Sequence, residues 1–272
     1  MIGAIIGDIV GSRFEFNNYR SKDFEFFGSD CTFTDDTVCT VAVADWILNS
    51  HEYGLTSGQR ASLIIQKWCI KYPGRGYGLM FLNWINDAKP YNSFGNGAGM
   101  RISPVGLFFD NETDLFKYSD MVTAISHNHP EGLKGARAIA LCMFLGRSGS
   151  SKTEIKERIS SEFGYNLNQK CDVISKTNTF DETCQVTVPQ AITAFLESTD
   201  FEDAIRLAVS IGGDTDTIAA MTGAIAEAYY KEIPAQIIKH VLSILPPEMV
   251  KVISEFYKLV SIGTGYDYIL NF

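Results

Sequence analysis

Two segments far apart in the sequence place aspartate and threonine side chains directly before apolar stretches. The first, TFTDDTV, contains Asp35 and Asp36, and the second, GGDTDTIA, contains Asp214 and Asp216. Carboxylate and hydroxyl oxygens are hard ligands that suit Mg²⁺, Mn²⁺ or Ca²⁺ better than Zn²⁺. If the two segments meet in the fold, their carboxylates repel one another unless cations lie between them. Together the two clusters therefore indicate a site for two metal ions.

Helix capping is the simpler reading of each cluster taken alone. Thr34 is a suitable N-cap for a helix that begins near Asp35, and acids in a first helical turn interact favourably with the helix dipole. In the second cluster, Asp214 or Thr215 could serve as the cap. However, each cluster carries two carboxylates where one oxygen would suffice. This excess favours the metal hypothesis when the clusters are considered together.

Two more acids lie near the N-terminus, in the segment GDIVGSRFEF. Asp8 and Glu15 flank a stretch that the glycines predict to be a turn. Asp8 could be a local cap or a member of the site, and both readings stay open. Glu15 lies between Phe14 and Phe16, so it is either exposed beside buried rings or partly desolvated and functional.

The segment YNSFGNGAGMRISPVG contains three glycines within five residues, Gly95, Gly97 and Gly99. A loop of this kind allows backbone N–H groups to approach an anion, and a helix N-terminus that follows would add a favourable dipole. The string matches neither the dinucleotide-binding fingerprint nor the P-loop. A plain flexible turn is therefore the alternative interpretation.

The segment SHNHPEG holds two of the four histidines, His127 and His129. Metal ligation, contact with a phosphate and a polar helix junction would each explain them. The junction is favoured for His129 because Pro130 follows it, whereas the role of His127 is open. The sequence supports no serine–histidine–aspartate or cysteine–histidine arrangement for nucleophilic catalysis.

Helical periodicity dominates the chain and predicts an all-α fold, with one domain over residues 1–272. Apolar residues recur at helical spacing in three segments, which begin near Val38, Leu133 and Ile218. Further helices are expected at 58–71, 76–87, 118–126, 153–162, 189–197, 201–210, 235–243 and 247–259. Two short strand signals stand apart at 23–27 and 184–188. The polar, turn-rich segment 146–184 is interpreted as a hinge or an insertion.

The composition is that of a soluble globular protein, with 46% hydrophobic and 20% charged residues. The net charge of −9 disfavours general binding to nucleic acids through their phosphates. No stretch approaches the ~20 apolar residues of a membrane span, and the N-terminal segment lacks the basic region of a signal peptide. Six scattered cysteines without a CxxC pair indicate reduced thiols and a cytoplasmic location.

Several motifs in a fixed order resemble those of the ADP-ribosylglycohydrolases, from Gly3 to about Ala228: GAIIGDIVGSRFEF, FTDDT, PGRGYG, FGNGAGMRISPVG, SHNHPEG and GGDTDT. The resemblance implies a compact, orthogonal bundle of helices with two divalent metals, Mg²⁺ or Mn²⁺, in a central cleft. One departure is Thr215, which stands where the family usually has alanine. It adds a hydroxyl group and removes no ligand. Another is the Ile-Ser before His127, where the family frequently has threonine.

The resemblance also assigns roles to individual residues. The implied metal ligands are Thr34, Asp35, Asp36, Asp214, Asp216 and Thr217. The implied catalytic residues are Glu15, Asp35 and Asp216, with Glu15 as general base or as a gate. The implied substrate-binding residues are Gly95, Asn96, Gly97, Gly99, Met100, Ser126 and His127.

The implied activity is hydrolysis of the glycosidic bond at C1″ of ADP-ribose, in an ADP-ribosylated protein or a small ADP-ribose conjugate. Such a cleavage passes through an oxocarbenium-like transition state. The alternatives are a non-catalytic ADP-ribose-binding protein and a structural protein of the same fold. A magnesium-dependent nucleotide pyrophosphatase is disfavoured because its glutamate-rich helix is absent from the sequence. We expect a monomer.

Overall fold

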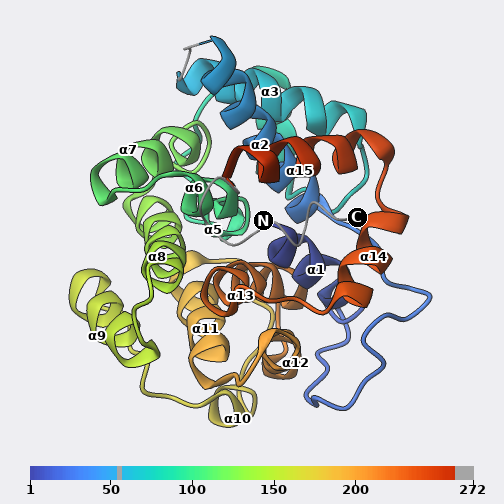
Figure 1. Ribbon diagram of the computed structural model, residues 1–272, viewed down its shortest axis with the longest axis vertical. Helices are drawn as coiled ribbons and strands as arrows, with labels where there is room; N and C mark the ends of the chain where they lie inside the picture. Colours follow the sequence, from blue (N-terminus) through green and yellow to red (C-terminus); the bar gives the residue numbers. More distant parts are fainter. Residues whose placement is uncertain (54–56, 261–272) are drawn as a thin grey trace.

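The computed structural model describes residues 1–53 and 57–260, which form helices joined by loops (Figure 1). The helices are α1 (Ile2–Gly11), α2 (Asp35–Tyr53), α3 (Gly58–Lys71), α4 (Leu79–Asp87), α5 (Gly97–Met100), α6 (Ser103–Phe108), α7 (Glu112–Thr123), α8 (Pro130–Arg147), α9 (Lys152–Phe163), α10 (Cys171–Ile174), α11 (Cys184–Glu197), α12 (Phe201–Ile211), α13 (Thr215–Tyr230), α14 (Ala235–Ile244) and α15 (Pro247–Val260). Within the described residues there is no strand, and β-type pairing is limited to one bridge between Gly95 and Thr183.

The predicted all-α fold is confirmed, and several helix boundaries agree closely with the prediction. α3 spans the predicted residues, and α12, α14 and α15 each end one residue later than expected. The strand expected at 184–188 is wrong, because these residues form the start of α11. The buried side chains of this stretch recur at helical spacing: Cys184, Thr187 and Val188. The stretch 23–27 is not a strand either and lies in the loop between α1 and α2.

The N-terminal glycines form a helix instead of the expected turn. All ten residues of α1 are buried, and Gly3, Gly7 and Gly11 lie on one face at a spacing of four. This face packs on α13 so closely that a Cβ atom on Gly7 would lie 2.0 Å from the carbonyl oxygen of Ala219. A Cβ atom on Gly3 would lie 2.3 Å from the carbonyl oxygen of Gly223. Only glycine permits this separation of the two helices.

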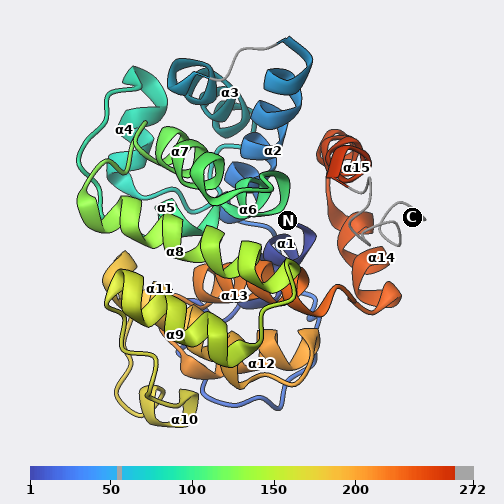
Figure 2. The ribbon, with the colours of Figure 1, turned by 60° about the vertical axis from the view of Figure 1, so that its left-hand side comes forward.

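α13 lies at the centre of the molecule, with α1, α8, α11 and α12 packed around it (Figures 1 and 2). Its residues from Thr215 to Ala228 are all buried. The order of the glycine contacts shows that α1 and α13 are antiparallel, because Gly3 faces Gly223 and Gly11 faces Thr215. The C-terminal end of α1 therefore lies beside the N-terminal end of α13, where the second acidic cluster begins.

The other end of this helix pair is held by a buried carboxylate. Glu227 on α13 accepts a hydrogen bond from the backbone N–H of Gly3 at 2.9 Å. The hydroxyl of Tyr257 on α15 donates to the same carboxylate and accepts from the backbone N–H of Ile2 at 2.8 Å. Every one of these groups is buried, so the hydrogen bonds fix α1, α13 and α15 relative to one another.

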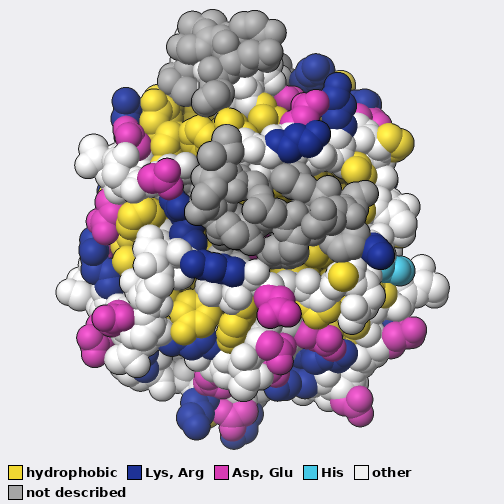
Figure 3. Space-filling model, in the orientation of Figure 1, with side chains coloured by type: hydrophobic (Ala, Val, Ile, Leu, Met, Phe, Trp, Pro, Cys, Tyr) yellow, Lys and Arg dark blue, Asp and Glu magenta, His cyan; other side chains and the backbone are white. Residues whose placement is uncertain are grey.

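The surface in Figure 3 mixes acidic, basic and hydrophobic side chains, as the composition predicts. Among the described helices, none is both long and apolar enough to cross a membrane. All six cysteines are free thiols. Segment 146–184 contains α9 and α10, and its last residues reach the cleft described below. The C-terminal stretch GTGYDYILNF, which carries no recognised motif, lies outside the described residues.

We predict that Gly7→Ala destabilises the protein, because the added methyl group would overlap the backbone of α13. Overpacking of this kind costs about 1–3 kcal/mol, which exceeds the gain of up to ~1 kcal/mol that alanine offers in a helix. Urea unfolding measures the change. Gly58→Ala is the matched control, since a Cβ atom there meets nothing closer than 3.5 Å. Equal stability of the two variants would refute the close contact.

Candidate active site

A cavity of about 640 Å³ opens where the predicted motifs converge. This volume falls within the range of about 300–1,000 Å³ that is usual for small-molecule sites. Its wall combines the loop after α1, the start of α2, residues 76–81, residues 91–101, His127, residues 180–182 and the start of α13. The acidic residues of the wall are Glu15, Asp35, Asp36, Glu182, Asp214 and Asp216. Arg101 is the one arginine or lysine among the lining residues.

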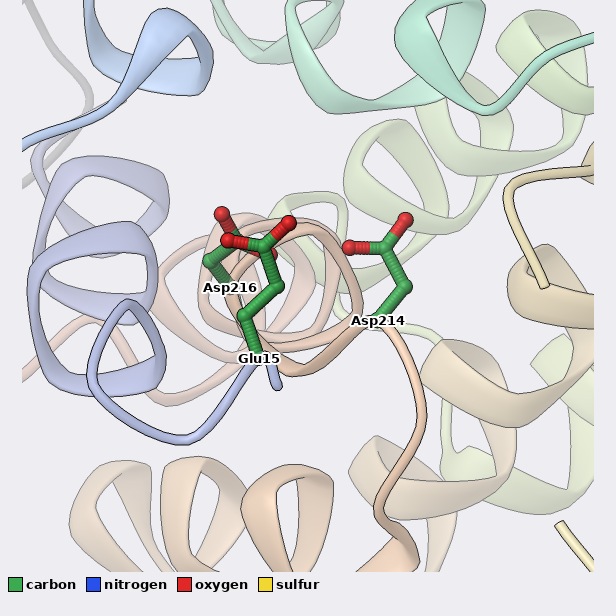
Figure 4. A group of neighbouring side chains, drawn as sticks. All are labelled: Glu15, Asp214 and Asp216. Carbon is green, nitrogen blue, oxygen red and sulfur yellow. The ribbon is translucent and has the colours of Figure 1, made fainter. Parts of the chain in front are cut away.

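Three carboxylates meet at the N-terminal end of α13. Carboxylate oxygens of Glu15, Asp214 and Asp216 all lie within 4.8 Å of one another. Figure 4 shows that the three groups point toward the same space, although Glu15 comes from the loop after α1 and the other two come from the start of α13. The antiparallel packing of α1 on α13 therefore brings the glutamate to the second cluster.

The first cluster is held in place by Asp8, a fully buried residue of α1. Its carboxylate accepts hydrogen bonds from the backbone N–H groups of Thr34 and Thr37, at 2.9 and 3.0 Å, and from both threonine hydroxyls. The hydroxyl of Thr34 in turn accepts from the backbone N–H of Asp36 at 3.3 Å. Asp8 thus acts as a distant cap for α2, and Thr34 is the local cap that the sequence suggested.

The second cluster is not explained by capping. Asp214 occupies the N-cap position of α13, but its side chain makes no capping hydrogen bond. Its carboxylate accepts instead from the side-chain amide of Asn96 in the glycine loop, at 2.6 Å. The Thr217 hydroxyl donates to Asp36 at 3.2 Å, which links the two clusters directly. Asp216 accepts from the backbone N–H of Thr217 in the first turn, at 2.9 Å, whereas Asp214 is directed to the glycine loop and not to the end of its own helix.

Thr215 has a structural part in this arrangement. Its side chain is fully buried and its hydroxyl donates to the carbonyl oxygen of Gly11 on α1, at 3.1 Å. It does not line the cavity. The departure from the usual alanine therefore leaves the cleft unchanged and adds a hydrogen bond to the contact between α1 and α13.

The electrostatics of the cluster are unfavourable for a set of bare carboxylates. Burial and then the charge of Asp216 raise the pKa values of Asp35 and Asp36 well above the ordinary range. Burial and then the charge of Asp214 do the same to the pKa of Asp216. Moreover, the Oδ1 atom of Asp36 is buried without a hydrogen-bond partner. A buried acceptor of this kind is costly unless it binds something.

Glu15 is the most accessible of the converging acids. Burial, followed by the charges of Asp216, Asp8 and Glu182, raises its pKa to about 8. Its neighbour Phe14 is buried whereas Phe16 is 82% exposed, so the glutamate stands at the boundary between core and solvent. The reading of Glu15 as partly desolvated therefore agrees with its position.

The donor set fits hard divalent cations. The carboxylates come from both clusters and the hydroxyls from Thr34 and Thr217, and all of these are oxygen ligands of the kind that Mg²⁺ and Mn²⁺ prefer. The orphaned oxygen of Asp36 and the mutual repulsion of the acids are both relieved by positive charge in the cavity. The residues present therefore fit a metal centre.

The glycine loop forms another part of the wall, in contact with Asp214 through Asn96, and is held by Glu182 and by the first residue of α11. The backbone N–H of Asn96 donates to the carbonyl oxygen of Glu182 at 2.7 Å, and that of Cys184 donates to Phe94 at 3.0 Å. A Cβ atom on Gly97 would lie 2.8 Å from the Nε2 atom of His127, so the loop rests on the imidazole ring. The glycines thus allow a close approach to His127.

The cavity brings together most, but not all, of the residues that the sequence singled out. Gly95, Asn96, Gly97, Met100 and His127 line it, as do Glu15, Asp35, Asp36, Asp214, Asp216 and Thr217. Thr34, Gly99 and Ser126 are not among the lining residues. A Cβ atom on Gly99 would lie 2.7 Å from the sulfur of Met221, which shows that this glycine serves helix packing. His129 is the N-cap of α8, as expected for a junction.

Sequence reasoning missed several residues of the site. Arg101 is fully buried in the cavity floor, and only its place after the glycine loop could have drawn attention to it. Phe180 and Glu182 lie in a segment without a recognised motif. Asp8 was recognised as an acid near the site, but its four hydrogen bonds depend on the fold.

Comparison with known proteins identifies the family. A profile described as ADP-ribosylglycohydrolase matches residues 1–261. The chain belongs to the ADP-ribosylglycohydrolase family. The members of this family are metal-dependent enzymes that hydrolyse ADP-ribosyl glycosidic bonds, and the resemblance seen in the motifs is thereby confirmed.

Individual relatives agree with this assignment. The ADP-ribosylhydrolase ARH3 of Xenopus tropicalis is 24% identical and aligns with 85% of this chain and 86% of its own length. The human ARH3 is 26% identical and aligns with 85% of this chain and 84% of its own length. A solved structure described as an ADP-ribosylglycohydrolase-related protein complex superposes with a TM-score of 0.71, at 22% identity and 95% coverage of both chains. This likeness supports the fold.

We predict that Asp8→Ala lowers the free energy of unfolding by at least about 2 kcal/mol, because it leaves buried threonine N–H groups without an acceptor. Asp8→Asn is the matched control. Its carbonyl oxygen can replace Oδ2, which accepts three of the four bonds, and its amide can donate to the Thr34 hydroxyl. Urea unfolding in EDTA should therefore show a much smaller loss for Asp8→Asn. Equal losses would contradict the capping role.

Proposed function

We propose that the protein hydrolyses the glycosidic bond at C1″ of ADP-ribose in an ADP-ribosylated protein or small conjugate. The convergence of Glu15, Asp214 and Asp216 at one wall of the cleft carries this proposal. Membership of the ADP-ribosylglycohydrolase family supports it, and so does a cavity large enough for a nucleotide-sized ligand.

Two divalent cations, Mg²⁺ or Mn²⁺, are part of the proposal. Thr34, Asp35 and Asp36 would hold them from α2, while Asp214, Asp216 and Thr217 would hold them from α13. Thr34 is compatible with this role although its hydroxyl donates to Asp8, because the oxygen keeps lone-pair capacity. When bound, the cations would neutralise the cluster, orient the sugar hydroxyls and lower the pKa of a water molecule.

The protein's own groups supply the remaining steps. The carboxylate of Glu15 projects over the same space as Asp214 and Asp216. Bound cations would offset the neighbouring charges that raise its pKa, and the ionised group could then take a proton from the attacking water. The backbone of the loop from Gly95 to Gly97 and the ring of His127 form the other wall, where they can hold the diphosphate. Positioning the ligand between these walls places C1″ near the acids.

The structural alternative is less well supported, whereas the turnover assay below separates an enzyme from a non-catalytic ADP-ribose-binding protein. A structural protein gains nothing from a cleft in which burial raises the pKa values of several aspartates. Each of these groups destabilises the metal-free fold. Placement of destabilising groups around a cavity is typical of sites that bind or catalyse.

The first test is release of free ADP-ribose from ADP-ribosyl-arginine, an ADP-ribosyl-serine peptide, O-acetyl-ADP-ribose and poly(ADP-ribose). We expect release from at least one substrate in Mg²⁺ or Mn²⁺ and none in EDTA. Chromatography detects the released ADP-ribose, and the substrate that yields it identifies the leaving group. Asp172→Asn, an exposed acid outside the cavity, should retain the activity, whereas Asp216→Asn should abolish it. Undiminished release by Asp216→Asn would refute the proposed centre.

The second test is the thermal stability of the protein without substrate. At a cation concentration of about 100 times Kd, binding stabilises the fold by about 2.7 kcal/mol, or roughly 5–10 °C in Tm for a chain of this size. We expect Asp216→Asn to lose this shift. Its melting temperature in EDTA should equal or exceed that of the wild type, because one buried like charge is gone. A lower value in EDTA would contradict the electrostatic argument.

A further inference from the structure

A chain of three polar side chains runs behind the cavity wall. The Nη2 atom of Arg101 donates to the Ser126 hydroxyl at 2.8 Å. The same hydroxyl lies 2.8 Å from the Nδ1 atom of His127. Arg101 and Ser126 are fully buried, and His127 is 5% exposed. The arrangement therefore leads from the interior to the imidazole of His127, which lines the cleft.

The direction of these hydrogen bonds follows from the donors available. A guanidinium group only donates, so the Ser126 oxygen must accept from Arg101. The serine proton then has one other group within reach in the described structure, the Nδ1 atom of His127. If Nδ1 carried a proton instead, the buried serine proton would be left without an acceptor, which is unfavourable.

A second contact supports the same assignment. The Nη2 atom of Arg101 also lies 3.5 Å from Nδ1 of His127. A guanidinium N–H beside a lone pair is attracted, whereas beside a second N–H it is repelled. In addition, burial and the charge of Arg101 lower the pKa of His127 well below its ordinary value. The ring is therefore neutral and its Nδ1 atom is the acceptor.

The remaining ring nitrogen faces the glycine loop. Cβ atoms built on Gly95 and Gly97 would lie 3.6 and 2.8 Å from Nε2 of His127. Within the described residues, Nε2 makes no hydrogen bond of its own. A neutral imidazole that accepts at Nδ1 must carry its proton at Nε2, so this wall of the cleft presents an unused N–H donor.

We propose that Arg101 and Ser126 are positioning residues that fix His127 in its Nε2–H tautomer, so that the ring donates to an oxygen of the bound ligand. Ser126 then acts behind the wall and does not touch the ligand. The inference about the ligand rests on the proposed function, whereas the tautomer is a property of the free protein. The two can therefore be tested separately.

Nuclear magnetic resonance of protein labelled with ¹⁵N-histidine gives the tautomer directly. The chain has four histidines, and the His127→Gln variant identifies the signal of His127. We expect a protonated Nε2 and an unprotonated Nδ1 at neutral pH. In Ser126→Ala the Nδ1 signal should shift toward a mixture of tautomers, and Ser126→Thr should restore the pattern. A wild-type ring protonated at Nδ1, or at both nitrogens, would overturn the proposal.

Calorimetric titration with ADP-ribose tests the consequence for the ligand. Loss of one well-oriented hydrogen bond predicts that Ser126→Ala weakens binding by roughly three- to tenfold. Ser62→Ala is the matched control, because its hydroxyl donates only within α3, to the carbonyl oxygen of Gly58 at 3.0 Å. It should bind ADP-ribose like the wild type.

The possible outcomes separate the two proposals. A shifted tautomer with unchanged affinity would show that Nε2 does not donate to the ligand. An unchanged tautomer in Ser126→Ala would show that Ser126 does not fix the ring. Failure of the wild type to bind ADP-ribose would count against the proposed function, while the spectrum of the free protein would still decide the assignment of the tautomer.

Discussion

The close contact between α1 and α13 is the constraint on which the site depends. Glycines at a spacing of four let the two backbones approach within a distance that any side chain would prevent. Because the helices are antiparallel, the end of α1 meets the start of α13, and Glu15 follows four residues after Gly11. The buried Thr215 hydroxyl, bonded to Gly11, holds that end in place. Wider separation of the helices would withdraw Glu15 from Asp216.

The same packing buries more negative charge than an apolar core tolerates alone. Asp8 illustrates how the fold stabilises a carboxylate locally, since it accepts four hydrogen bonds from two threonines. Asp36 illustrates the opposite case, because one of its oxygens is buried without a partner. The fold therefore provides hydrogen-bond donors for both oxygens of Asp8, which supports the site. It leaves one oxygen of Asp36, which belongs to the site, without a donor. This difference separates a structural carboxylate from one that is available to a cation.

The sequence predicted the acids of the site because they lie in short local motifs that can be recognised without the fold. It also located helices such as 58–71, whose apolar period is clear. It missed α1, because a helix buried on all sides has no polar face and glycine disfavours helices locally. The resemblance placed Ser126 among the substrate-binding residues, and the sequence could not show that its side chain does not line the cavity. Those features depend on tertiary packing, which overrides local preference.

The carboxylates of Asp35, Asp36, Asp214 and Asp216 reach the cleft from the starts of α2 and α13. Under the proposed function, cations held by these acids would bind hydroxyl groups of a sugar. The neutral His127 lines the cleft beside the glycine loop and can donate to an oxygen acceptor, whereas the N–H groups of Gly95 and Asn96 already donate to Ser93 and Glu182. Arg101 adjoins this imidazole, where its Nη2 atom donates to Ser126 and its charge helps to keep the ring neutral, while its Nε and Nη1 atoms have no hydrogen-bond partner among the described residues. Under the proposed function, a ligand with a sugar at one end and phosphates at the other would therefore place its sugar on the acids and a phosphate oxygen near His127.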